Sequence, residues 1–167
     1  MGGPRFIADG MLGKLSRWLR LAGYDVVYVG DLKLPPEEQD DALVARAKAE
    51  KRILVTCDID LHRRAKRTGV ESTFIRSNDV VEQLVEISRR SGYRIEIKPE
   101  NSRCPVCNGL LKKARKEEIQ GKVPENVIMA HQEFWKCSSC GKIYWQGTHW
   151  QTIIEMAEKY NRLVGEC

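Results

Sequence analysis

Short apolar runs alternate with longer amphipathic stretches along the first half of the chain. The apolar runs are rich in β-branched and aromatic residues, which is typical of buried strands, and they cover residues 5–9, 25–29, 52–56 and 72–76. In the amphipathic stretches apolar residues recur at helical spacing, and these stretches cover residues 11–22, 39–50, 61–68 and 80–91. Strands that alternate with helices predict a parallel sheet with right-handed crossovers and helices on both faces. The expected fold class is therefore α/β, with three α/β/α layers.

The pattern changes after residue 91. We expect one further strand at residues 93–98, followed by a linker at 99–102. From residue 103 to 148 helical periodicity is weak and turn residues are frequent, and an amphipathic pattern that predicts a closing helix returns at 150–164. These shifts indicate two modules, which we place at residues 1–99 and 100–167.

The overall composition narrows the class of protein. Hydrophobic residues make up 42% of the 167-residue chain and charged residues 31%, which excludes a disordered or collagen-like protein. No apolar run approaches the roughly 18 residues that a membrane-spanning helix needs, and the first ten residues lack the layout of a secretion signal. We therefore expect a cytoplasmic protein without a membrane partner. The formal net charge of +5 favours anionic partners such as nucleic acid.

Acidic residues gather where the predicted strands end. Asp9 closes the first strand, Asp58 follows the third strand, and Asp40 and Asp41 are expected to open the second helix. Ligands of parallel sheets collect at the carboxyl ends of the strands, so we expect these carboxylates to converge. Crowded carboxylates repel one another unless a cation neutralises them, and Mg²⁺ or Mn²⁺ suits such oxygen ligands.

Helix capping is the alternative role for these acids. Asp is a favoured N-cap residue, so Asp41 and Asp58 could each do no more than bind backbone N–H groups. Capping does not account for Asp9, which is expected to end a buried strand directly before Gly10. We therefore regard Asp9 as the strongest single candidate for a functional acid.

Basic residues lie close to the acids in sequence. Lys14, Arg17 and Arg20 lie on the first predicted helix opposite its apolar stripe, and residues 63–67 make a dense basic patch on the third helix. Cations beside a metal held by acids are typical of phosphoryl-transfer chemistry, in which they bind phosphates. Both groups could also be solvated helix faces, and the position of the first group favours a functional role.

Two Cys-x-x-Cys pairs predict a metal site. They are Cys104 with Cys107 and Cys137 with Cys140, separated by 29 residues. Each pair can form a tight knuckle whose thiolates point at one ion, and four thiolates select Zn²⁺. Such a site has no open position for catalysis, so its role is to hold a short module in shape. Two disulfides are the competing interpretation, which a reducing cytosol disfavours.

Aromatic residues surround the second Cys pair. Trp135, Tyr144 and Trp145 have Lys136 and Lys142 as neighbours. Aromatic rings with nearby cations can stack on bases and bind phosphates, but in so small a module they can equally form its core. Both interpretations stay open, with packing the favoured one.

Taken together, these motifs resemble those of a known family. Residues 6–25 (FIADGMLGKLSRWLRLAGYD), 52–58 (RILVTCD), 104–109 (CPVCNG) and 137–150 (CSSCGKIYWQGTHW) are similar to the signatures of the Mut-seven C-terminal RNase domain family, a PIN-like group. The resemblance implies a PIN-like α/β/α domain joined to a zinc ribbon. It also implies a metal-dependent ribonuclease whose acids are Asp9, Asp41 and Asp58, with Asp40 as a replacement for Asp41. In one departure, Cys57 stands where the family usually has Arg.

We therefore expect an endonuclease that acts on single-stranded or structured RNA. Mg²⁺ or Mn²⁺ would be held by the three acids, the backbone would be positioned by Lys14, Arg17 and Arg20, and the zinc ribbon would also contact RNA. The alternative is a non-catalytic protein that binds RNA or a ribonucleoprotein and has a degenerate acidic site. A homodimer stays open, because PIN-like proteins often pair.

Overall fold

The computed structural model describes residues 3–165. Its first part is a parallel sheet in the order β2-β1-β3-β4. The strands are β1 (Phe6–Ala8), β2 (Val26–Tyr28), β3 (Ile53–Thr56) and β4 (Ser72–Phe74). The central strands β1 and β3 are buried along their whole length, which is why each is a continuous apolar run in the sequence.

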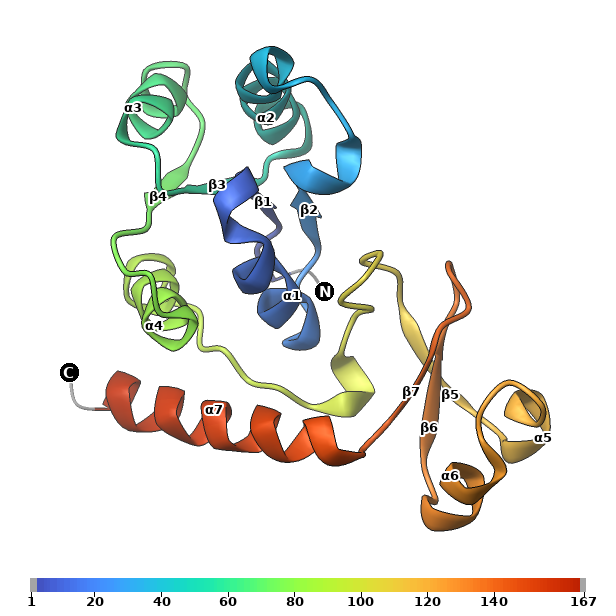
Figure 1. Cartoon of the computed structure of the whole chain (residues 1–167). Coiled ribbons are helices and arrows are strands. Elements are labelled where there is room, and N and C mark those ends of the chain that lie inside the picture. Colours follow the sequence, from blue (N-terminus) through green and yellow to red (C-terminus); the bar gives the residue numbers. More distant parts are fainter. Residues whose placement is uncertain (1–2, 166–167) are drawn as a thin grey trace.

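Helices cover both faces of this sheet (Figure 1). On one face lie α1 (Gly13–Leu21) and α4 (Val80–Ser91), and on the other α2 (Pro36–Glu50) and α3 (Ile59–Arg67). Side chains of a strand alternate between faces, and accordingly Phe6 and Ala8 belong to the core under α1 and α4 while Ile7 belongs to the core under α2 and α3. The expected three-layer α/β/α class is confirmed.

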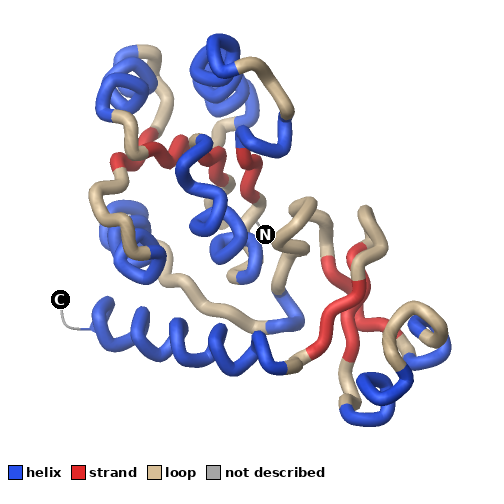
Figure 2. Tube along the Cα trace, in the orientation of Figure 1, coloured by secondary structure: helices blue, strands red, loops and turns tan. Residues whose placement is uncertain are grey.

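The expected strand at residues 93–98 does not form. Figure 2 draws this segment as loop between α4 and the short helix η3 (Pro99–Asn101). Its alternating Ile95 and Ile97 pack on the helical core instead of extending the sheet. The backbone N–H of Ile95 donates to the Tyr160 hydroxyl at 2.8 Å, so a side chain provides the partner that a strand would have found in its neighbour.

The Cys-rich module is a small antiparallel sheet in the order β5-β6-β7. Its strands are β5 (Leu111–Ala114), β6 (Phe134–Cys137) and β7 (Ile143–Trp145), and its short helices α5 (Lys116–Ile119) and α6 (Glu125–Ala130) lie between β5 and β6. The core of this ribbon is small: Ala114, Ile119, Val123 and Phe134 are its buried members. A core of this size explains why the module needs a further stabilising element.

The closing helix α7 (Thr148–Gly165) runs back along α4 (Figure 1). Its Tyr160 is 2% exposed and belongs to the core of the α/β part. The Tyr160 hydroxyl lies 2.7 Å from that of Ser88 on α4. The sequence placed this helix in the second module, at residues 100–167. In the structure, α7 packs on α4 of the α/β part.

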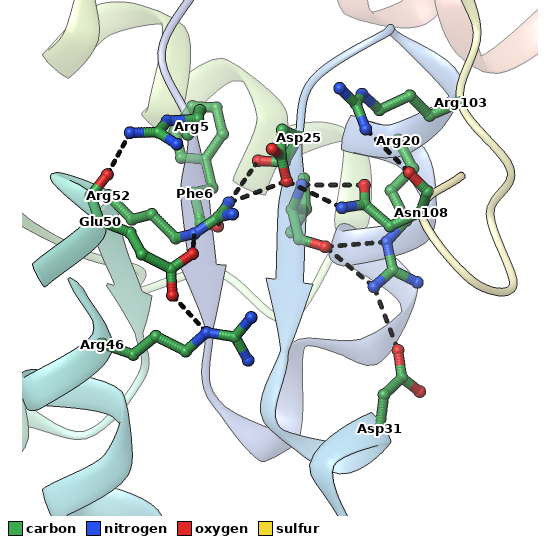
Figure 3. A network of polar contacts seen from close by, with 11 residues as sticks. Arg5, Phe6, Arg20, Asp25, Asp31, Arg46, Glu50, Arg52, Arg103 and Asn108 are labelled. Carbon is green, nitrogen blue, oxygen red and sulfur yellow. Dashed lines mark hydrogen bonds and ion pairs between the residues drawn. The ribbon is translucent and has the colours of Figure 1, made fainter. Parts of the chain in front are cut away.

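The ribbon meets the α/β part through polar contacts at β2 (Figure 3). The Asn108 side chain accepts from Val26 N at 3.0 Å and donates to Asp25 at 2.8 Å. Asn108 follows the first Cys pair directly and has φ 71°, a conformation that Asn adopts more readily than most residues. Asp25 also accepts from Arg52 at 2.9 Å, so one carboxylate ties the ribbon to β2 and β3.

Among residues 3–165, no helix is both long enough and apolar enough to cross a lipid bilayer.

Candidate functional site

Asp9 stands directly after β1, and both of its carboxylate oxygens are held. Oδ1 accepts from the backbone N–H of Gly10 at 2.7 Å, and Oδ2 accepts from the Thr56 hydroxyl at 2.8 Å. The first bond caps the short helix η1 (Gly10–Leu12), so our expectation that Asp9 has no capping role is wrong. Each carboxylate oxygen has two lone pairs, and one on each remains for a further ligand.

Asp58 caps α3 from the end of the neighbouring strand. Its Oδ1 accepts from the backbone N–H groups of Asp60 and Leu61 at 2.9 and 3.2 Å. This confirms the capping interpretation for Asp58. Its Oδ2 makes no hydrogen bond within residues 3–165, so that half of the carboxylate is available to a ligand.

Thr56 links the two acids. This last residue of β3 is fully buried, and while its hydroxyl donates to Asp9 it accepts from the backbone N–H of Asp58 at 3.0 Å. The position of both acids therefore depends on one buried hydroxyl. Sequence reasoning missed Thr56, although a polar residue that ends an otherwise apolar strand directly before an acidic segment was a visible signal.

The second helix brings Asp40, not Asp41, towards these acids. Burial raises the pKa of Asp40 above its usual value, and the charges of Asp9 and Asp58 raise it further. Asp41 instead pairs with Arg64, and its side chain is 74% exposed. Because α2 begins at Pro36, both lie in its second turn and do not open the helix as expected. We call Asp9, Asp40 and Asp58 the acid rim, and the geometry favours Asp40 over the expected Asp41 as its third member.

The acid rim is wider than a closed metal cage. Within residues 3–165, only the cysteines of the two Cys pairs form a group of three or more potential ligands whose ligand atoms all lie within 4.8 Å of one another. The rim nevertheless has the donor chemistry for a hydrated divalent cation, because Mg²⁺ keeps several waters and is usually bound by one or two carboxylates. Burial is the main reason for the raised pKa of Asp40, and the charges of Asp9 and Asp58 add to it, so a cation bound here would be attracted by several carboxylates.

The cations expected on α1 divide into two groups. Lys14 and Arg17 are exposed, close in sequence to Asp9, and have no carboxylate within 4.0 Å among residues 3–165. Arg20 is 4% exposed and donates to the carbonyl oxygens of Val26 at 2.9 Å and Pro105 at 3.0 Å. The guanidinium of Arg20 therefore joins α1 to β2, as Figure 3 shows, and to the ribbon through Pro105. It does not face substrate as we expected.

Cys57 lies between acidic neighbours. Burial raises the pKa of its thiol, and the charges of Asp9 and Glu86 raise it further. The raised pKa keeps the thiol in its neutral form near neutral pH, and a thiol carries no positive charge in either form. The structure thus gives no sign that Cys57 replaces the cation expected at this position.

The Cys residues form the second candidate centre. The Sγ atoms of Cys104 and Cys140 lie 3.8 Å apart, and those of Cys107 and Cys137 lie 3.4 Å apart. Tetrahedral Zn²⁺ with Zn–S bonds of about 2.3 Å would place its sulfurs roughly 3.8 Å from one another. The spacing of these thiols therefore fits a zinc ion.

Backbone N–H groups near the second Cys pair lower the pKa of one of these thiols. Although burial works the other way, N–H groups of Cys140 and Ser139 lower the pKa of Cys137 to about 7, and both N–H groups lie 3.4 Å from its Sγ. Burial raises the pKa of Cys107 to about 12, and hydrogen bonding with the neighbouring thiols contributes. A thiolate therefore forms readily at Cys137, and a bound metal ion would favour loss of the proton at Cys107.

The aromatic residues of the ribbon mostly pack. Trp135 is 7% exposed, the Tyr144 hydroxyl lies 3.0 Å from Cys104 Sγ, and the ring of Trp145 lies 6.4 Å from that of Phe134. Lys142 lies over the Tyr144 ring at 5.7 Å. These contacts support the packing interpretation for the three aromatic residues.

Comparisons with known proteins give one match. Neither the search of curated proteins nor the search of solved structures found a similar protein. A family model described as "Mut7-C RNAse domain" matches residues 4–157, a span that includes the acid rim and both Cys pairs. Because the match covers most of the α/β part and the whole ribbon, the chain belongs to the Mut7-C RNAse domain family.

Proposed function

We propose that this protein is a metal-dependent endoribonuclease that cuts RNA at the acid rim. The observation that carries the proposal is the Thr56 hydroxyl, which binds Asp9 and the backbone N–H of Asp58 and so holds both acids at the carboxyl edge of the sheet, where parallel α/β proteins bind their ligands. Membership of an RNase domain family supports the same activity.

The proposed roles follow from the contacts of each residue. Thr56 fixes Asp9 and Asp58 through its hydroxyl, and the free Oδ2 of Asp58 and the remaining lone pairs of Asp9 would bind Mg²⁺ or Mn²⁺. When bound, the cation would lower the pKa of a water and stabilise negative charge at phosphorus. Asp40 would hold a water of the hydrated ion or the attacking water by a hydrogen bond. Lys14 and Arg17 would bind phosphates next to the cut.

The ribbon has a structural role in this proposal. Zn²⁺ bound by Cys104, Cys107, Cys137 and Cys140 would hold the knuckle that places Asn108 against Asp25 and Val26. Four protein ligands leave no position open for a substrate, so we assign no chemistry to this ion.

Cleavage of labelled RNA tests the proposal. Single-stranded and structured RNAs are incubated with Mg²⁺, Mn²⁺ or no added divalent cation, using the parent and an Asp9→Asn, Asp58→Asn double variant. We expect cleavage only with the added cation. In the double variant the rate should fall by about a hundredfold or more, because several kcal/mol of charge stabilisation are lost. Zinc content and thermal unfolding are measured on the same samples to show that both proteins are folded.

The alternative outcome has a clear signature. Equal cutting by parent and variant would identify a contaminating nuclease. RNA binding without any cleavage in Mg²⁺ or Mn²⁺ would identify a non-catalytic RNA-binding protein.

A further inference from the structure

A hollow lies at the edge of the sheet opposite the acid rim. Its volume is about 570 Å³, and it is lined by residues just before β1, by the turn before β2, and by parts of the segment 94–103. We call it the junction hollow, because the α/β part, the linker and the beginning of the ribbon all contribute to its wall. The proposed cleavage site makes no use of it.

Cations from distant parts of the sequence converge on the junction hollow. Arg5, Arg94, Lys98 and Arg103 line it. Neutral oxygens hold the arginines in place: Arg5 donates to the carbonyl of Glu50, Arg94 to the Asn161 side chain at 3.2 Å, and Arg103 to the carbonyl of Asn108 at 2.9 Å.

These arginines form no direct ion pair, although the charge of Arg103 acts on Asp25 from a longer distance. Of the ion pairs within residues 3–165, none includes Arg5, Arg94 or Arg103. Hydrogen bonds to neutral oxygens position a guanidinium without cancelling its charge. The hollow therefore presents several oriented donors that have no carboxylate within 4.0 Å among residues 3–165.

The acids of the junction hollow are already paired. Asp25 accepts from Arg52 at 2.9 Å and from Asn108 at 2.8 Å (Figure 3), and Glu96 pairs with Lys98 at 3.0 Å. Arg5 and Arg103 lie on either side of Asp25 in the same view. The uncompensated charge of the hollow is consequently positive, and the three arginines supply it.

The wall of the hollow is held in shape. Gly23 has φ +93°, and a Cβ atom there would lie 2.6 Å from the carbonyl oxygen of Asn101. Only glycine allows the linker to come so close. The Tyr24 hydroxyl donates to the carbonyl of Arg94 at 3.1 Å, which fixes the segment that carries Arg94. The backbone segments that carry Arg94 and Arg103 are therefore held in fixed positions.

We propose that the junction hollow binds a phosphate group of an RNA strand, a proposal that rests on the proposed ribonuclease function. Arginine binds phosphate oxygens through its planar fork of donors. The hollow lies at the opposite sheet edge from the acid rim, so it would hold a different nucleotide from the one that is cut. It would anchor the strand by its backbone or by a terminal phosphate.

Binding measurements on a cleavage-deficient background test this site. The Asp9→Asn, Asp58→Asn protein, with zinc retained and no Mg²⁺ or Mn²⁺ added, is titrated into fluorescent 12-nucleotide single-stranded RNAs that carry either a 5′-phosphate or a 5′-hydroxyl. Arg94→Gln with Arg103→Gln removes two donors from the hollow. Arg90→Gln with Arg162→Gln is the matched control, because it removes the same charge from exposed positions on α4 and α7 that do not line the hollow.

We expect the hollow variant to bind RNA about tenfold more weakly than its background. The slope of log K on log salt should flatten by roughly 0.7, because one single-strand phosphate contact is lost. A loss confined to the 5′-phosphorylated RNA identifies a terminal phosphate, and an equal loss for both RNAs identifies the backbone. If circular dichroism shows that the Arg94→Gln, Arg103→Gln variant is unfolded, Arg5→Gln provides a second variant. It loses one hydrogen bond, to the backbone carbonyl of Glu50.

Unchanged affinity and salt slope in the hollow variants, or an equal loss in the Arg90→Gln, Arg162→Gln control, would overturn the proposal. Cleavage by the parent is measured separately. If the parent cuts RNA while the hollow variants bind normally, only the junction hollow is wrong. If binding needs the arginines while the parent does not cut, the hollow stands and the nuclease proposal fails.

Discussion

Asp40 and Asp41 are neighbours in sequence with different surroundings. Successive residues of an α-helix point about 100° apart, so only one of the two can face the acid rim. The burial of Leu43, Val44 and Ala47 on the sheet sets the rotation of α2 about its axis. Asp40 is turned towards Asp9 and Asp58, whereas Asp41 reaches Arg64.

Replacing each of these two acids separately should affect RNA cleavage very differently. Asp40→Asn is expected to lower RNA cleavage by about a hundredfold, and Asp41→Asn to change it less than about threefold. Because the pKa of Asp40 is raised in the folded state, folding disfavours its charged form. Asp40→Asn should therefore raise the thermal unfolding temperature at pH 7 without divalent cations. Equal cleavage by the two variants would contradict this assignment.

Single residues could be placed where a general rule of the fold fixes their position. That Asp9 and Asp58 lie at the same edge of the sheet was predictable, because acids that follow the strands of a parallel sheet collect there. The choice between Asp40 and Asp41 needed the rotation of a helix, which long-range packing decides. Arg20 was misassigned for a similar reason: it lies on the polar side of an amphipathic helix, but its carbonyl partner Pro105 is 85 residues away.

Among the elements, the strands with a continuous apolar run and the helices with a regular apolar stripe were predictable. The helix at 80–91 has the predicted bounds, and the expected strands differ from β1 to β4 only at their ends. The segment 93–98 shows the limit of the pattern. Alternation of Ile95 and Ile97 with polar residues predicts a strand, but the same alternation arises wherever an extended chain lies on an apolar surface, here that of α1, α4 and α7.

The contact between this segment and α7 should be sensitive to one hydroxyl. Tyr160→Phe keeps the ring but removes the partner of the Ile95 N–H and of the Ser88 hydroxyl. We expect the free energy of unfolding to fall by about 1–3 kcal/mol, the cost of leaving a buried polar group unpaired. Chemical denaturation measures this change. Tyr93→Phe, at a residue that is 45% exposed, is the control and should change stability by less than about 0.5 kcal/mol. An equally small effect of Tyr160→Phe would show that the hydroxyl is not needed.

At the scale of the whole molecule, the ribbon is attached at both of its ends. Ser102 at its start donates to the Leu21 carbonyl at 2.6 Å, and α7 at its end packs on α4. The Cys spacing predicted the metal-binding module. It could not predict that Asn108, one residue beyond the first Cys pair, would bind Asp25, because that contact depends on how the two modules meet.

Loss of the zinc site should therefore act beyond the ribbon. Cys104→Ser is expected to lower zinc content and to unfold the ribbon first, as measured by elemental analysis and hydrogen exchange. The strand β2 should then exchange faster than in the parent, because Asn108 no longer holds Val26 and Asp25. Cys57→Ser removes a cysteine that lies outside the metal-binding group, and it should keep its zinc. Unchanged zinc stoichiometry in Cys104→Ser would contradict the assignment.

The position of α7 after the ribbon also has a consequence for the order of events on the ribosome. The helices α1 and α4 and the whole sheet are synthesised early, but Tyr160 and its neighbours, which complete the core between them, are translated only after both Cys pairs. Nascent chains fold largely from the amino terminus onwards. The growing chain would thus be able to bind zinc before α7 covers its side of α4. Zinc binding would fold the ribbon and so place its end where α7 begins.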